Sequence, residues 1–524
     1  MQMASEFPED FPKEYHRLLE IWGKYDDIIN AFQILDWDEK TQMPRSGAEA
    51  RSDQMATLQS LAHEVLTSSE VGKLLAKLEP WENTLPYHSD EASIIRVARR
   101  QYEKAVKVPA RLVEEISRAG SEGYNVWLEA REANDFRLFA PSLRRIYELD
   151  RELCDALGYS DHPLDALLDQ SEPGMKIRDV ESLFAELKDA LVPLVKTISE
   201  KRDAVRDDIL HRRFDEAKQW ELGLQGVEAI GFNLKEGRAD RSVHPFSTSF
   251  SPRDVRITSR VFPDSFNPCF FGFLHEAGHG HYMQGIPLKY RRTPLADGAS
   301  AGVHESQSRM WENLVGRSRG FWRRFFPKLQ AMFPAETSGT TFEDWYRAVN
   351  KVEPSFIRVE ADEVTYNLHI LIRFELEKAV YDGKMDIPDL RDAWNKRFED
   401  YLGIMPSTDL EGILQDIHWT GEFGASFVSY TLGNVMSVQF YDAALREKPE
   451  LREQFETGDY SGLLDWTRRR IHAHGSKYTP GEEMATGRPL STEPYLRYLT
   501  DKFAEGPDPM RSRRSRPAAS SHNA

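Results

Sequence analysis

Apolar residues recur at steps of three and four along most of the chain, which is the spacing of an amphipathic α-helix. The clearest stretches are EYHRLLEIWGKYDDIINAFQILDW, EASIIRVARRQYEKAV, VESLFAELKDALVPLVKTI and NLHILIRFELEKAVYDG. Proline-containing segments such as DQSEPGMK and GIMPSTD interrupt the pattern and mark breaks between helices. The pattern therefore predicts a mostly α-helical protein.

One region departs from the helical spacing. Residues 244–250 (HPFSTSF) and 254–262 (DVRITSRVF) are short and rich in β-branched and aromatic side chains, which is typical of strands. We expect these two strands to pair and to lie beside the apolar segment that follows them. The expected architecture is one large helical body with a small β-sheet.

The chain shows no internal repeat and no low-complexity linker before about residue 505. We therefore expect a single domain over residues 11–503, preceded by a short extension at residues 1–10. The helices within residues 11–135 are candidates for an N-terminal cap. Residues 504–524 are basic, rich in Ser and poor in apolar side chains, so we expect a disordered tail.

Composition narrows the class of protein. The chain has 524 residues, of which 40% are apolar and 29% charged, as in ordinary soluble globular proteins. No apolar run reaches the roughly 18 residues of a membrane helix, and the acidic N-terminal segment lacks the apolar core of a signal peptide. With only Cys154 and Cys269 present, we expect no disulfide framework and a cytoplasmic location. The net charge of −17 argues against nucleic acid and anionic membranes as partners.

The run FFGFLHEAGHGHYMQG places His275, Glu276 and His279 in apolar surroundings and suggests a metal site. Positions i and i+4 share a helix face, so both histidines can direct a ring nitrogen at one ion, at about 2.0–2.1 Å for zinc. Glu276 can then reach a water on that ion without ligating it. The alternative is a core helix with hydrogen-bonded histidines. Gly278 and Gly280 each weaken a helix by about 1 kcal/mol, which indicates that another element packs close to the backbone there.

A third ligand is available in the segment GVHESQSRMWENLVGRS. Glu305 lies 26 residues after His279 (305 − 279) on a separate helical segment, and a glutamate from a following helix completes a two-histidine, one-carboxylate zinc site with one open position. The alternative for Glu305 is a surface ion pair with Arg309 at i+4. His304 is also nearby, whereas His281 points to a different helix face and is a poor ligand.

HEAGH followed by HESQSRMWEN resembles the carboxypeptidase Taq family of zinc metallocarboxypeptidases. The segments LDWDEKTQMPRSGAEARSDQ, GRADRSVHPF, DVRIT, IRVEADEVTYNLHILIRFELE, GILQDIHW and SYTLGN fit the same family in the same order. The resemblance covers about residues 11 to 503. It implies a helical fold with a deep groove, a homodimer, and removal of C-terminal residues from peptides with a free C-terminus. Broad specificity is implied, with C-terminal proline as the usual exception.

The resemblance also assigns residues. It implies that one zinc ion per chain is held by His275, His279 and Glu305, with Glu276 as general base; the sequence does not distinguish zinc from cobalt. The chain departs from the family in TGEFGASFVSYTLGN, where Ser426 replaces an expected tyrosine and Val428 an expected proline. This departure affects the expected substrate wall and leaves the metal ligands unchanged.

Two arginines are candidates for binding the terminal carboxylate of a substrate, because the guanidinium fork matches two carboxylate oxygens. Arg358 in IRVEAD is the carboxylate binder that the resemblance implies. Its alternative is an ion pair with Glu360 or Asp362. Arg256 in DVRIT is the second candidate, and its alternative is an ion pair with Asp254.

Three further side chains are candidates for contact with the reacting groups. His418 in QDIHW could hydrogen-bond the developing oxyanion, or it could cap a helix. Tyr430 could donate its hydroxyl to the tetrahedral intermediate, or it could belong to the core. His244 in HPF could approach the site from the small sheet.

These features together predict a zinc-dependent carboxypeptidase. A helical zinc oligopeptidase that cleaves internal bonds would share the metal site and lack the carboxylate clamp. A catalytically silent relative that binds peptides would retain the fold alone. The intact HEAGH and Glu305 argue against the silent relative, and Ser426 keeps it open.

Overall fold

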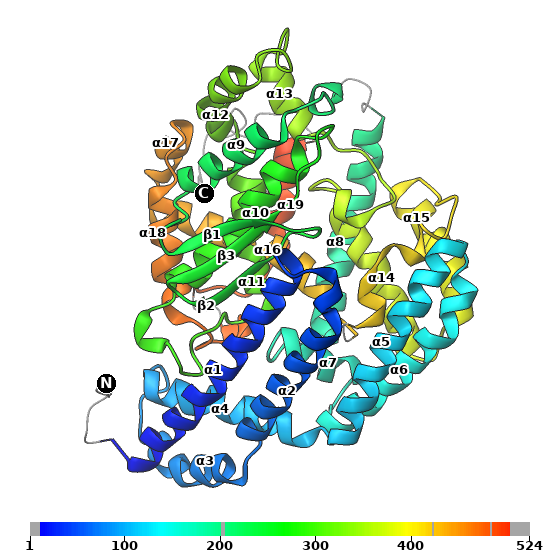
Figure 1. Cartoon of the computed structure of the whole chain (residues 1–524). Helices are drawn as coiled ribbons and strands as arrows, with labels where there is room; N and C mark the ends of the chain where they lie inside the picture. The colour runs from blue at the N-terminus through cyan, green and yellow to red at the C-terminus, as the bar shows by residue number, and fades with distance from the viewer. Residues whose placement is uncertain (1–10, 201–204, 422–423, 483–484, 504–524) are drawn as a thin grey trace, which may run out of the picture.

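The computed structural model describes residues 11–200, 205–421, 424–482 and 485–503, and within them the chain is mostly α-helical (Figure 1). The expected N-terminal extension and basic tail lie outside the described residues. The first half contains α1 (Lys13–Thr41), α2 (Ala48–Leu66), α3 (Ser69–Glu82), α4 (Asp90–Lys107), α5 (Ala110–Ala133), α6 (Phe136–Leu157), α7 (Pro163–Ser171), α8 (Ile177–Ser199) and α9 (Glu216–Ala229). None of the described helices is long and apolar enough to cross a membrane.

The second half begins with the sheet and carries the helices that form the site. The strands are β1 (Gly237–Arg241), β2 (Ser247–Ser251) and β3 (Asp254–Ser259). The helices are α10 (Asn267–Gly285), α11 (Ala301–Arg309), α12 (Arg319–Met332), α13 (Phe342–Val349), α14 (Tyr366–Tyr381), α15 (Leu390–Leu402), α16 (Val428–Glu447), α17 (Leu451–Glu456), α18 (Ser461–Arg470) and α19 (Glu493–Phe503). A π-helical turn, η5 (Met310–Val315), continues α11.

The small sheet has the order β1-β3-β2 and packs against α10. The predicted pairing of β2 with β3 is confirmed: the two are antiparallel, with Ser247 opposite Ile257. The sequence pattern missed β1, which pairs with β3 in parallel. β1 reads GRADR and contains no β-branched or aromatic residue, so tertiary pairing rather than propensity makes it a strand.

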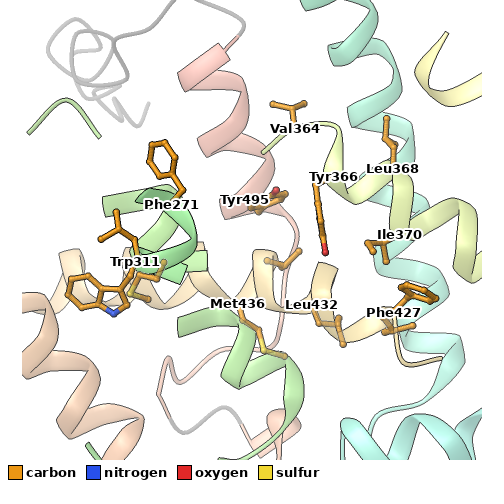
Figure 2. Close-up of a cluster of buried hydrophobic side chains, with 14 of the residues drawn as sticks. Phe271, Trp311, Val364, Tyr366, Leu368, Ile370, Phe427, Leu432, Met436 and Tyr495 are labelled. Carbon is orange, nitrogen blue, oxygen red and sulfur yellow. The ribbon is translucent and has the colours of Figure 1, made fainter. Parts of the chain in front are cut away.

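The main core lies where α10, α14, α16 and α19 meet. Figure 2 shows part of it: Phe271 of α10 and Trp311 of η5 lie on one side, Leu368 and Ile370 of α14 on the other, with side chains of α16 between them. α16 is buried on nearly every face, and this explains why its sequence shows no polar stripe.

A second, smaller core lies within the first four helices. Apolar residues of α1, α3 and α4 pack together and are joined by Ile286, Tyr290 and Leu295, which follow α10 directly. Side chains of α5, such as Leu112, belong instead to the main core. The helices α1–α4 therefore form a cap with its own core, and the cap contacts the body beside β2 and at the end of α10 (Figure 1).

Two glycines allow α11 to pack closely between α10 and α16. A Cβ atom on Gly278 would lie 2.6 Å from the carbonyl oxygen of Gln307, and one on Gly433 would lie 2.5 Å from Cγ of Glu305. Gly280 is equally restricted, because a Cβ there would lie 2.4 Å from the ring of Phe232. The close packing expected from the glycines of the HEAGH segment is confirmed, and it sets the position of Glu305.

Candidate metal and peptide site

Three side chains with metal-ligand chemistry meet between α10 and α11. One ligand atom from each of His275, His279 and Glu305 lies within 4.8 Å of the others. Oε2 of Glu305 is 3.7 Å from Nε2 of His275 and 3.4 Å from Nε2 of His279. The triad combines two imidazoles and a carboxylate, the donor set of catalytic zinc sites, so these residues fit a divalent metal ion.

Partners outside the triad hold each of these side chains in place. Nδ1 of His275 is 2.9 Å from Oε2 of Glu312, and Nδ1 of His279 is 2.7 Å from Nδ1 of His304. Nε of Arg309 donates to Oε1 of Glu305 at 2.6 Å. The far atom of every ligand is thus engaged, which directs the near atoms to one point and strengthens the fit to a metal.

The geometry bears on two residues that the sequence singled out. Glu305 pairs with Arg309 through Oε1, as its alternative interpretation expected, but the pair is buried rather than at the surface, and Oε2 of Glu305 faces the two histidines. His281 is fully buried against the ring of Trp311, with centroids 4.9 Å apart, and is not part of the triad, as predicted.

Glu276 follows His275 on α10 and is 5% exposed. Burial raises the pKa of its carboxyl above the ordinary value, and the charges of His275 and His279 offset this only in part. His244, in the segment between β1 and β2, is exposed, and its Nδ1 is 2.8 Å from the carbonyl oxygen of Pro245. The charge of His244 also lowers the pKa of Glu276.

A buried arginine cluster adjoins the metal triad. Arg358 is 5% exposed; its Nε donates to Oδ1 of Asp416 at 3.0 Å and its Nη1 to the hydroxyl of Tyr366 at 3.0 Å. Nε of Arg373 donates to the other oxygen of Asp416 at 2.6 Å. The guanidinium of Arg309 lies 4.4 Å from the ring centroid of Tyr366, so Tyr366 connects this cluster to the metal triad.

His418 and Tyr430, predicted from separate motifs, lie next to each other. Nε2 of His418 is 3.3 Å from the hydroxyl of Tyr430, and the guanidinium of Arg358 lies 5.3 Å from the Tyr430 ring. Burial, together with Arg358, lowers the pKa of His418 to about 4. Asp416 immediately precedes the short helical turn that carries His418.

Arg256 has the partner that the sequence offered as its alternative. Its guanidinium makes two 3.0 Å hydrogen bonds to Asp254 and lies 4.3 Å from the ring centroid of Trp37 in α1. It therefore joins the sheet to the cap. Arg358 differs from expectation in its partner, because Asp416 takes the place of Glu360 and Asp362.

Sequence reasoning missed two carboxylates, one half-buried and one buried. Glu312 lies seven residues after Glu305 (312 − 305), or about two helical turns, so its place on the same helix face was an available signal. Glu172 is fully buried, accepts from the backbone of Gly302 in the first turn of α11 and from Oγ of Ser429 at 2.6 Å, and has its pKa raised by burial to about 7. No local pattern points to Glu172, because both of its partners are distant in the sequence.

The triad opens into a cleft of about 1040 Å³. His279, Glu305, Ser426 and Tyr430 line it together with residues of α2 and α4 in the cap. Two of the three candidate ligands, His279 and Glu305, therefore face the same space as Tyr430.

An HExxH helix that supplies two histidines, a glutamate from the following helix and an adjoining cleft together define a helical metallopeptidase. Comparison with known proteins specifies the class further. Residues 17–503 match the model of the carboxypeptidase Taq (M32) metallopeptidase family, and the chain belongs to this family. It is a metallocarboxypeptidase.

Relatives match over nearly the whole chain. Thermostable carboxypeptidase 1 of Thermus thermophilus is 43% identical over 501 residues, covering 94% of this chain and 98% of the relative. Carboxypeptidase 1 of Bacillus subtilis is 36% identical over 496 residues, covering 94% and 98%. The crystal structure of the M32 carboxypeptidase from Deinococcus radiodurans R1 superposes with a TM-score of 0.90 at 41% identity, covering 94% of this chain and 99% of that one.

Proposed function

We propose that this metallocarboxypeptidase removes single C-terminal residues from peptides with broad specificity and with poor turnover of C-terminal proline, and that its metal is zinc. His275, His279 and Glu305 would hold the ion, and their donor set supports zinc, with cobalt as the alternative. When bound, the metal polarises the scissile carbonyl and lowers the pKa of a water toward about 7.

Glu276 acts as the general base in this proposal. It takes a proton from the attacking water and later passes it to the leaving amine. Its burial beside His275 supports the role, because a raised pKa brings a carboxyl closer to neutral pH. Tyr430, whose hydroxyl is held by His418, donates to the carbonyl oxygen of the scissile bond as that oxygen gains negative charge. His244 borders the site on the sheet side.

The observation that carries the exopeptidase assignment is a buried cluster with a net positive charge. Arg358 and Arg373 share the single carboxylate of Asp416, so the three side chains sum to +1. A buried uncompensated charge is costly until an anion joins it. Nε and Nη1 of Arg358 are already engaged, so a terminal carboxylate would meet the edge that carries Nη2.

The test compares peptides that end in a free carboxylate with the same peptides ending in an amide. The wild type should prefer the free terminus, and Arg358→Ala should reduce the ratio of kcat/KM values by about 10- to 150-fold, since a hydrogen bond to a charged group contributes about 1.5–3 kcal/mol. Arg358→Lys should recover part of the ratio, because it retains the charge and lacks the fork.

Arg256→Ala is the matched control. It removes the same charge from a residue that already has Asp254 as its partner, and it should leave the ratio unchanged. If Arg358→Ala left the ratio intact and Arg256→Ala reduced it, the clamp would belong to Arg256. A wild-type ratio near one would refute the carboxylate clamp altogether.

We also infer a homodimer and a cytoplasmic location from the likeness to the family and from the composition. Light scattering at micromolar concentration measures the oligomeric state directly, and a monomer would contradict the inferred dimer.

A further inference from the structure

The cleft extends from the metal triad to the cap. Its lining includes Gln59 and His63 of α2 and Arg100, Gln101 and Lys104 of α4. A volume of about 1040 Å³ is at the upper limit of small-molecule pockets, so the cleft has room for several peptide residues. A carboxypeptidase leaves only one residue beyond the cut, so the rest of the substrate must pass along this cleft.

Arg100 differs from the other basic side chains of α4. Arg99 donates to Glu82 at 2.8 Å, Lys104 pairs with Asp169 at 2.6 Å, and Lys107 donates to a carbonyl oxygen of Leu157 at 3.0 Å. Arg96 also donates to backbone and side-chain oxygens. Within the described ranges, Arg100 has no hydrogen bond and no ion pair.

At the position of Arg100, the lack of a hydrogen-bond or ion-pair partner has a free-energy cost. The side chain is half-buried and lines the cleft, and burial lowers its pKa. Desolvating a guanidinium without a partner costs free energy, and solvent-exposed arginines do not incur that cost. A ligand carboxylate would supply the missing partner, as it does for arginine in general.

The surroundings of Arg100 favour an acidic group on an extended ligand. Lys104, the other Lys or Arg side chain that lines the cleft, is paired with Asp169, and the charge of Asp169 also acts on Arg100 from beyond ion-pair distance. Among the described residues, Arg100 is therefore the cleft-lining guanidinium or ammonium group without an ion pair of its own. The neighbouring wall is apolar and includes Leu66, Val108 and Leu157. The net charge of −17 does not cancel this attraction, because exposed charges beyond about 8 Å are screened at physiological ionic strength.

We propose that Arg100 forms an upstream subsite that binds an aspartate or glutamate side chain of the peptide, several residues before the cleaved bond. The enzyme would then favour peptides with an acidic residue at that distance from the C-terminus. The inference rests on the carboxypeptidase function. It adds a sequence preference in the part of the substrate that lies upstream of the cleaved bond.

The experiment uses a set of peptides with identical last two residues, so that the metal site and carboxylate clamp meet the same groups. A single glutamate is moved through successive upstream positions and compared with glutamine at the same position. For the wild type we expect one position at which glutamate raises kcat/KM by about 10-fold, the lower end for a charge-assisted hydrogen bond. Arg100→Gln should remove this ratio, and Arg100→Glu should transfer the preference to lysine.

Arg323→Gln is the control. Arg323 is exposed on α12, outside the cleft, and the substitution changes the net charge by the same amount, so the preference for glutamate should persist. The proposal is overturned if the wild type shows no acidic preference at any position, or if Arg100→Gln retains it. It is also overturned if Arg100→Gln slows the glutamate and glutamine peptides equally, because Arg100 would then bind the peptide backbone.

Failure of the underlying function gives a different result. A blocked dipeptide is too short to extend from the metal site to the cap and tests only the removal of a C-terminal residue by the wild type. Cleavage of the dipeptide without any acidic preference in longer peptides would refute the Arg100 subsite alone.

Discussion

Glu312 should control how tightly the metal is held, although it does not belong to the triad. Its Oε2 accepts from Nδ1 of His275 at 2.9 Å, and this contact fixes the imidazole so that Nε2 faces Glu305. Arg309 at 3.3 Å and Arg317 at 3.4 Å complete its surroundings. These charges outweigh the effect of burial and hold the pKa of Glu312 near 2, so the group is a carboxylate at neutral pH.

Glu312→Gln is the informative change, because the amide keeps the size and one acceptor oxygen and loses the charge. Partners that orient a metal-binding histidine typically contribute about 10- to 100-fold in metal affinity, or about 1.4–2.7 kcal/mol. We therefore expect the dissociation constant for zinc to rise by that factor. Competition with a fluorescent chelator measures it, and the metal release rate should rise with it.

Glu343 provides a matched control. It pairs with Arg319 at 2.8 Å and with Arg347 at 3.2 Å, so Glu343→Gln also removes a carboxylate from two arginines, but at α13 and without a histidine. Its zinc affinity should equal that of the wild type. If Glu312→Gln binds zinc as tightly as the wild type while its metal-free form unfolds at the same temperature, the orienting role assigned to Glu312 is wrong.

Three further outcomes are expected. Glu305→Ala should lose most of its bound zinc by elemental analysis; full occupancy would remove Glu305 from the ligand set. Glu276→Gln should keep zinc and lose about 10²- to 10⁴-fold in kcat; retention of a tenth of wild-type turnover would contradict the general-base role. Burial raises the pKa of Glu377, which accepts from the backbone of Ala425, from its ordinary value of 4.5 to about 8. The folded state therefore binds this proton more tightly, and the free energy of unfolding should fall as pH rises from about 4.5 to about 8. Glu377→Gln should flatten that fall in urea titrations, and an unchanged slope would count against it.

Local sequence patterns were sufficient to predict that the three candidate metal ligands lie together, because their geometry follows from helix periodicity and short spacing. His275 and His279 are one turn apart, and Glu305 lies on the next helix of the chain. The pairing of β2 with β3 was predictable for the same reason, since the strands are adjacent and β-branched. These features are determined by residues that are close in sequence.

Features that depend on distant partners could not be predicted. Arg358 finds Asp416 58 residues away, while its local alternative Glu360 pairs with Arg260 on the strand side. Glu172 finds Ser429 257 residues away. From a single sequence only the spacing along the chain is known, so partners that are close in sequence are considered first. The distant pairs form because α14 and α16 pack in the folded protein.

The cap has a hydrophobic core of its own, and three of its members, Ile286, Tyr290 and Leu295, follow α10 directly. A small hydrophobic core contributes less free energy of folding than a large one. We therefore expect the cap to open as a cooperative unit before the body does. Opening would release the C-terminal end of the helix that carries His275 and His279. The rate of amide hydrogen exchange in the last turn of α10 should then depend on opening of the cap rather than on unfolding of the body. In mild denaturant, the enzyme should lose activity at a lower concentration than it loses its helical circular-dichroism signal.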